Sequence, residues 1–179
     1  TKLTSYKLFI TANNYKGDQD IKFSVVRYGN VMGSRGSVIP FFHSKKNSGI
    51  IPITDERMTR FNITLQKGVD FVLQCVENMW GGEVFVPKIP SYRIVDVAKA
   101  IAPECKHEIV GIRPGEKLHE VMCPSDDSHL TIDFNDHFVI VPSITFFSRE
   151  SDFTRNSIGE TGVSVEQGFE YNSGTNTHF

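Results

Sequence analysis

Two arginines and an asparagine that follow a short apolar run are the first residues suited to chemistry. Arg27, Asn30 and Arg35 lie in a glycine-punctuated segment directly after Phe23–Val26, a run typical of a buried strand. Glycines allow the backbone to approach a ligand closely, and guanidinium and amide groups donate hydrogen bonds to phosphate or sugar oxygens. One interpretation of the segment is therefore an anion site. The same residue types also build ordinary polar turns, so this segment alone supports both interpretations equally.

A second polar group, in Gly111–Glu120, also follows an expected strand. Pro114 fixes one backbone angle and Gly115 permits a turn, so we expect Arg113 and Glu116 to lie near the end of that strand. Open α/β sheets bind ligands at such positions. An arginine there can hold a diphosphate through paired hydrogen bonds, and a carboxylate can accept hydrogen bonds from both hydroxyls of a ribose. The alternative is a surface ion pair, which contributes little to stability.

A third segment, Ile51–Thr64, carries Arg57 and Arg60 just before the longest expected helix. Exposure to solvent is the usual explanation for such arginines. They become candidates for a ligand site only in combination with the other two segments.

The elements that must position these residues alternate between helices and strands. The clearest is a helix capped by Thr64, with an apolar stripe that we expect to pack on a sheet, formed by Leu65, Val69, Val72, Leu73 and Val76. A helix with Leu3, Tyr6 and Ile10 on one face comes first. Other helices are expected from Ser37 and over residues 94–102, and strands over residues 23–26, 83–86, 108–111 and 138–141. This alternation predicts an α/β fold.

Composition excludes several classes of protein. The 179 residues suffice for a folded core, and the net charge of −2 argues against a general surface for nucleic acid or acidic membranes. Cys75, Cys105 and Cys123 are widely spaced and form no C-x-x-C pair, so we expect reduced thiols, no zinc site and a cytoplasmic location. The histidines show no metal-ligand spacing. No apolar run approaches the length of a membrane span.

Several segments together carry a family resemblance that extends over almost the whole chain. In chain order they are RYGNVMGSRGSVIPFF, DERMTRFNIT, GGEVFVPKIPS, IVGIRPGEKLHE and FEYNSGTN. The sequence resembles the C-terminal half of the extended short-chain dehydrogenase/reductase enzymes that act on nucleotide-diphosphate sugars. It is most similar to the inverting UDP-N-acetylglucosamine 4,6-dehydratases of pseudaminic acid biosynthesis, which serve flagellin glycosylation.

The resemblance assigns roles to individual residues. Lys2 matches the lysine of a Tyr-x-x-x-Lys motif, which has a catalytic role and contacts the cofactor, and Tyr28 and Gly29 match positions beside the nicotinamide. The residues that match substrate-binding positions are Asn30 for the sugar diphosphate, Ser37, Val38, Pro40, Pro52 and Thr54 for the uracil, Arg60 and Arg113 for the diphosphate, and Glu116 for the ribose.

The resemblance also implies an architecture. Residues 1–130 are expected to combine the end of a Rossmann-like NAD(P)-binding domain with an interleaved substrate-binding domain, and residues 131–179 to form a C-terminal extension. The glycine-rich dinucleotide loop and the catalytic tyrosine would precede Thr1. We therefore expect a fragment that is inactive by itself and that belongs to a homo-oligomeric enzyme.

The implied chemistry needs NADP or NAD, bound mainly by that preceding half. Oxidation at C4 of the sugar acidifies the proton at C5, water leaves from C6, hydride returns to C6, and C5 is protonated from the opposite face. The expected partner is a UDP-sugar, with no nucleic acid, membrane or metal. Two alternatives remain: a UDP-sugar C4 epimerase, and a noncatalytic module that binds a nucleotide sugar.

Overall fold

The computed structural model describes residues 2–143 and 152–178, without the side chains of Lys2 and Leu3. The chain forms two compact units, each built from separated segments. Unit 1 comprises Thr1–Arg27, Val69–Lys88 and Cys123–Glu170, and unit 2 comprises Tyr28–Gly68, Ile89–Met122 and Tyr171–Phe179. In the described part of the chain, no helix is both long enough and apolar enough to cross a bilayer.

A five-stranded mixed sheet forms the centre of unit 1, in the order β1-β5-β10-β9-β11. Its strands are β1 (Val25–Val26), β5 (Val84–Pro87), β9 (Thr131–Asp133), β10 (His137–Ile140) and β11 (Val163–Ser164). Strands β1 and β5 are parallel, with Val25 opposite Val84, whereas β10 is antiparallel to both β5 and β9. The parallel pair and the α/β alternation confirm the predicted fold class.

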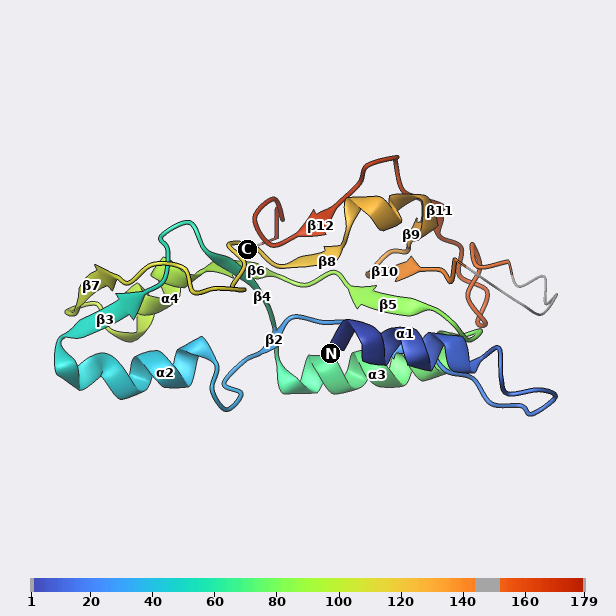
Figure 1. The fold of residues 1–179 in the computed structure, drawn as a ribbon, viewed down its shortest axis with the longest axis horizontal. Coiled ribbons are helices and arrows are strands. Elements are labelled where there is room, and N and C mark those ends of the chain that lie inside the picture. Colours follow the sequence, from blue (N-terminus) through green and yellow to red (C-terminus); the bar gives the residue numbers. More distant parts are fainter. Residues whose placement is uncertain (1, 144–151, 179) are drawn as a thin grey trace. The chain divides into compact units, whose positions relative to one another are not determined.

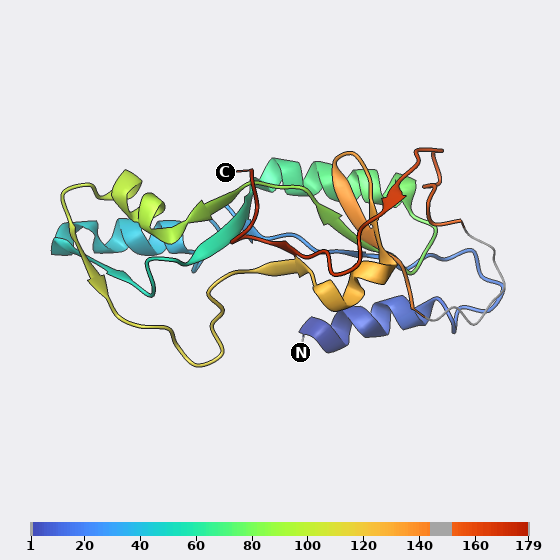
Figure 2. The ribbon, with the colours of Figure 1, turned by 90° about the horizontal axis from the view of Figure 1, so that it is seen from above.

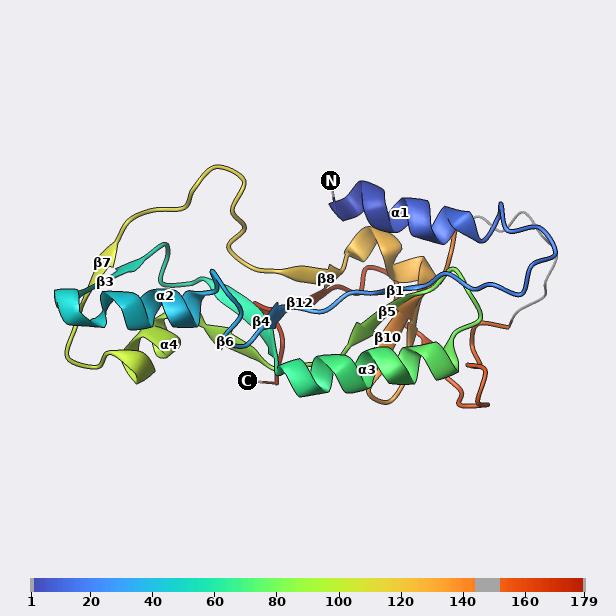
Figure 3. The same ribbon diagram turned by 90° about the horizontal axis from the view of Figure 1, so that it is seen from below.

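Two helices cover opposite faces of this sheet, as Figures 2 and 3 show. Phe71 of α3 (Leu65–Asn78) packs with Phe85 and Val139 in the core. Val84 lines a pocket together with residues of α1 (Lys2–Ala12). Because neighbouring residues of a strand point to opposite faces, α1 and α3 lie on different sides. A 3-10 helix, η2 (Ser125–Leu130), precedes β9.

The predicted helix over residues 64–76 is confirmed, but the predicted packing face is wrong. The hydroxyl of Thr64 accepts a hydrogen bond from the N–H of Lys67 at 3.2 Å, as expected of a cap. The side chains buried on the sheet are instead those of Phe71, Cys75 and Asn78. The expected stripe is exposed at Leu65, Val69, Val72, Leu73 and Val76. Apolar residues occupy two adjacent faces of this helix, and periodicity cannot decide which of them the sheet covers.

Unit 2 contains three small sheets and two helices. The sheets are β2-β4-β6, β3-β7 and β8-β12. The strands are β2 (Asn30–Val31), β3 (Ile50–Ile53), β4 (Thr59–Ile63), β6 (Ser91–Arg93), β7 (Lys106–Ile109), β8 (Val121–Cys123) and β12 (Tyr171–Asn172). The helices are α2 (Val38–Lys45), followed by the 3-10 turn η1 (Lys46–Ser48), and α4 (Ile94–Ile101).

The core of unit 2 lies where α2, α4 and β3 meet, on the side of the ribbon where Figure 1 labels these elements together. Phe42, Ile51, Ile53 and Ala98 are completely or almost completely buried there. The strand predicted over residues 108–111 is β7, which begins two residues earlier and pairs in parallel with β3, with Ile53 opposite Ile109. These contacts pack β3 and α2 into the core of unit 2.

Candidate functional site

A pocket of about 680 Å³ lies within unit 2. This volume is within the usual range for small-molecule sites. All residues that the sequence assigned to substrate binding line it, namely Asn30, Ser37, Val38, Pro40, Pro52, Thr54, Arg60, Arg113 and Glu116. Residues separated by up to 86 positions are thereby brought into one cavity. The lining also includes Arg35, already a candidate from the sequence, together with Ser34, Gly36, Phe41, Phe42, Met58 and Ile94.

The elements of unit 2 explain why these residues converge. Asn30 begins β2, which pairs in parallel with β4 so that Asn30 lies opposite Asn62, while Arg60 comes from the same strand β4. Val38 and Pro40 come from the first turn of α2, and Pro52 from β3. Strands β2, β3 and β4 and helix α2 therefore all contribute residues to the lining.

The Arg113–Glu116 turn has the local structure expected from its sequence. Gly115 has φ of +82°, a conformation that other residues rarely adopt. The N–H of Glu116 donates to the carbonyl of Arg113 at 3.0 Å, and the N–H of Arg113 donates to the Glu116 carboxylate at 3.4 Å. Arg113 itself is exposed. The turn follows the end of β7 at Ile109 by a few residues, and both charged residues reach the pocket.

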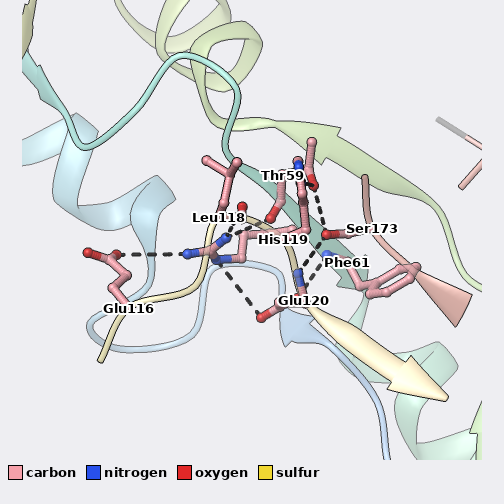
Figure 4. Close-up of polar contacts among 8 residues, drawn as sticks. Thr59, Phe61, Glu116, Leu118, His119, Glu120 and Ser173 are labelled. Atoms are coloured by element: carbon pink, nitrogen blue, oxygen red, sulfur yellow. Dashed lines mark hydrogen bonds and ion pairs between the residues drawn. The ribbon is translucent and has the colours of Figure 1, made fainter. Parts of the chain in front are cut away.

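Arg60 is held in the site by hydrogen bonds and ion pairs. Its Nη1 donates to the carbonyls of Thr59 at 2.7 Å and Leu118 at 3.0 Å, and its side chain is 12% exposed. Its Nη2 is 3.8 Å from the Glu116 carboxylate. Figure 4 shows Glu116 on one side of this network and Glu120 on another. Arg60 is thus a largely buried guanidinium with one edge directed toward an acid of the pocket.

The two arginines of the 51–64 segment have different environments. Arg57 is 73% exposed and pairs with Asp55 through two contacts, Nε to Oδ1 at 3.0 Å and Nη2 to Oδ2 at 2.8 Å. Hydrogen bonds from Arg57 lower the pKa of Asp55 to about 2. Only Arg60 lines the pocket, so the surface explanation suits Arg57 and not Arg60.

The hydroxyl of Ser37 is a buried polar group of the pocket. Ser37 precedes α2, but its hydroxyl does not cap the helix as the sequence suggested. Its Oγ is buried and, among the described residues, has no hydrogen-bond partner. Buried hydroxyls are normally satisfied, so this atom is available to a ligand.

The residues assigned to the cofactor do not line this pocket. Gly29 precedes β2, and a Cβ added there would lie 2.4 Å from Cβ of Phe61, which explains the glycine by the close approach of β4. Tyr28 is 40% exposed. Lys2 begins α1 in unit 1, and its side chain lies outside the described part of the structure, as does Thr1. Their assigned roles stay predictions.

Arg27, the first arginine of the sequence segment, belongs to unit 1. Its guanidinium lies 5.0 Å from the ring centroid of Tyr6 and lines a separate pocket of about 440 Å³. Asn30 and Arg35 do line the candidate site. The segment thus contributes two of its three polar residues to one pocket.

Sequence reasoning missed two polar residues close to the site. Burial raises the pKa of the Tyr92 phenol, whose hydroxyl is hydrogen-bonded to Asn30. Burial also raises the pKa of Glu120, against the opposing effects of the Phe61 N–H and Arg60. Glu120 is the last residue of the GIRPGEKLHE segment that also contains Arg113. Membership of this segment is the one feature of the sequence that could have pointed to Glu120. Among residues 2–143 and 152–178, no cluster of three or more His, Cys, Asp or Glu side chains could hold a metal ion.

Comparison with known proteins defines the class. The model of the polysaccharide biosynthesis protein family matches residues 1–142. The chain therefore belongs to this family.

Two relatives, a dehydratase and an epimerase, show how similar the chain is to each kind of enzyme. It is 55% identical over 178 residues to the UDP-N-acetylglucosamine 4,6-dehydratase (inverting) of Campylobacter jejuni, covering 98% of this chain and 53% of that protein. It is 37% identical over 145 residues to a UDP-glucose 4-epimerase of Rickettsia conorii, covering 78% of this chain and 42% of the epimerase. The predicted resemblance to the inverting dehydratases is thus confirmed.

A solved structure supports the same relationship. Pen from Bacillus thuringiensis superposes with a TM-score of 0.80 at 30% identity, over 98% of this chain and 52% of that one. The chain spans about half the length of the relatives that it matches.

Proposed function

We propose that this chain supplies the UDP-binding part of an inverting UDP-N-acetylglucosamine 4,6-dehydratase. The observation that carries the proposal is the pocket of unit 2, which combines Arg60, Arg113 and Glu116 with the Ser37 hydroxyl, a group without a hydrogen-bond partner in the described part of the chain. Two cations suit a diphosphate, and hydroxyl and carboxylate groups suit the nucleoside. The 55% identity to an enzyme of that name supports the choice of activity.

Within this proposal each side of the pocket has a role. Arg60 and Arg113 bind the diphosphate, Glu116 accepts hydrogen bonds from the ribose hydroxyls, and Asn30 donates its amide to the sugar-diphosphate oxygens. The residues assigned to the uracil share the α2 and β3 sides of the lining, namely Ser37, Val38, Pro40, Pro52 and Thr54. Phe41 and Met58 add apolar surface to the same pocket.

The reaction requires a nicotinamide group next to the sugar. A bound NADP or NAD would supply the hydride acceptor for C4 of the hexose and the hydride donor for C6. The part of this chain in that step is to hold the UDP end of the substrate so that the hexose is kept in one orientation. Tyr28 and the backbone of Gly29 border the nicotinamide, and Lys2 contacts its ribose, as the family motif implies.

The proposal extends to the cellular setting. As the family resemblance implies, the complete protein would be a cytoplasmic, homo-oligomeric enzyme that acts in pseudaminic acid biosynthesis for flagellin glycosylation. The division into residues 1–130 and an extension over 131–179 stays a prediction for the complete enzyme.

The activity is tested by incubating the complete protein with UDP-N-acetylglucosamine in deuterium oxide. Protonation at C5 by solvent predicts a product that has lost one water and carries deuterium at C5, measured by mass spectrometry and NMR. A product of unchanged elemental composition, inverted only at C4, would instead identify an epimerase, the activity named for the 37% identical relatives. Binding of UDP without turnover would identify the noncatalytic module.

A further inference from the structure

Glu120 lies beside the candidate site without lining its pocket. One oxygen of its carboxylate accepts a hydrogen bond from the N–H of Phe61 at 2.9 Å, and the other lies 4.0 Å from Nε of Arg60. The side chain is only 29% exposed. Figure 4 shows this carboxylate beside strand β4, whose residues Thr59 and Phe61 flank Arg60 in the sequence.

The three nitrogens of the Arg60 guanidinium have different neighbours. Both carbonyls that it binds, those of Thr59 and Leu118, are acceptors for Nη1. Nε faces Glu120, and Nη2 faces Glu116 of the pocket. Because a guanidinium is planar, holding Nη1 and Nε determines where the Nη2 hydrogens point.

Glu120 is itself fixed by Ser173, which comes from the C-terminal segment of unit 2. The N–H of Glu120 donates to Oγ of Ser173 at 2.9 Å, and the N–H of Ser173 donates to the carbonyl of Glu120 at 2.8 Å. Oγ of Ser173 also shares a hydrogen bond of 2.7 Å with the hydroxyl of Thr59. Ser173 is completely buried, so the backbone of Glu120 has little freedom to move relative to β4.

We propose that Glu120 is a positioning residue that orients the Arg60 guanidinium toward the diphosphate, an inference that rests on the proposed role of Arg60. Glu120 acts through Arg60 and does not touch the ligand. Its carboxylate attracts the Nε edge electrostatically across 4.0 Å while the two carbonyls hold Nη1 by hydrogen bonds, so Nη2 is presented to the pocket before a ligand arrives. Such preorganisation reduces the ordering cost of binding.

The electrostatic environment of Glu120 agrees with this coupling. Burial raises the pKa of its carboxyl group, whereas the N–H of Phe61 and the charge of Arg60 oppose that rise. The carboxylate therefore depends partly on Arg60 for the stability of its charge. The dependence is reciprocal, because each ion lowers the cost of keeping the other partly buried.

A double-mutant cycle on UDP affinity tests the inference. Calorimetry with UDP is carried out on the complete protein, on Glu120→Gln, on Arg60→Ala and on the double variant. Gln has the size of Glu and retains an oxygen that can accept from Phe61, so the substitution removes mainly the charge. Glu120→Gln is expected to weaken UDP binding about fivefold in the presence of Arg60, and to change it less than about twofold in its absence.

The controls separate positioning from a general effect on the fold. Glu104→Gln, at an exposed site of unit 2, is expected to leave UDP affinity and thermal unfolding unchanged. Equal losses from Glu120→Gln with and without Arg60 would overturn the positioning role in favour of a structural one. No loss from Glu120→Gln alongside a loss from Arg60→Ala would overturn the inference and leave the proposed function intact. UDP affinity unchanged by Arg60→Ala would overturn both.

Discussion

At the scale of single residues, the structure separates side chains that the sequence presents as equivalent. Arg57 and Arg60 are three positions apart in the same segment, and their residue types say nothing about burial. Arg57 forms an exposed pair with Asp55, whereas Arg60 is held by backbone carbonyls at the pocket. Along β4, alternate residues are buried, but long side chains can bend toward either face. The family resemblance assigned Arg60 to the substrate, and the structure places it in the pocket lining, whereas its contacts with Thr59 and Leu118 could not be read from the sequence.

The pair formed by Asp55 gives a prediction at this scale. Asp55 is expected to titrate with a pKa of about 2 because Arg57 donates hydrogen bonds to its charged form. A folded-state pKa below the unfolded value means that the contribution to stability is present above the ordinary carboxyl pKa of 3.8 and is lost as the pH falls toward 2. Arg57→Ala should return the pKa toward 3.8, measured by NMR titration of the carboxyl carbon.

The lysine variant Arg57→Lys is a useful control, because it keeps the charge and loses the paired geometry. It should give an intermediate value. A pKa of Asp55 that does not respond to either substitution would show that the pair is absent in solution.

At the scale of elements, the positions of helices and strands along the chain were predicted better than the way in which they pack. The expected strands at residues 83–86 and 138–141 correspond to β5 and β10, and the cap at Thr64 forms as expected. The face of α3 was wrong, since Phe71 and Cys75 face the sheet in place of the Val69 and Val72 stripe. Periodicity gives the rotation of a helix only when a single face is apolar. Helix α3 has two.

The contact between Gly29 and Phe61 gives a prediction for β2 and β4. Gly29→Ala would place a Cβ 2.4 Å from Cβ of Phe61 and 2.9 Å from its carbonyl oxygen, so the two segments must move apart. Overpacking of this kind costs about 1–3 kcal/mol, which denaturant unfolding of the variant should detect. Gly33→Ala provides a comparison, because there the limit is a positive φ of 71° with no neighbouring atom within 4 Å.

Loss of stability at Gly33→Ala alone would contradict the steric explanation for Gly29. Full stability of Gly29→Ala with UDP affinity retained would show that β2 and β4 do not approach closely in solution.

At the scale of the whole chain, the segments that form the pocket were easier to predict than the contacts that bring them together. The segments that form the pocket, from Asn30 to Glu116, were recognised individually, and their convergence followed only from the family resemblance. No local pattern brings β3 and β7 together or places the turn at Arg113 near α2. Such contacts depend on long-range packing, here the core of Phe42, Ile51 and Ala98. The contacts of Glu120 and Ser173 could not be predicted from the sequence. These two residues stood out only as members of the segments GIRPGEKLHE and FEYNSGTN.

The central claim is that the pocket of unit 2 binds the UDP part of an activated hexose through its arginines. Calorimetry of UDP with the complete protein, Arg113→Ala and Arg57→Ala tests it most directly, because Arg113 lines the pocket and Arg57 does not. Removing one partner of a charge pair that becomes desolvated on binding predicts a loss of ~2–4 kcal/mol for Arg113→Ala, and Arg57→Ala should bind as the unmodified protein does. UDP affinity that is the same for all three proteins would contradict the claim.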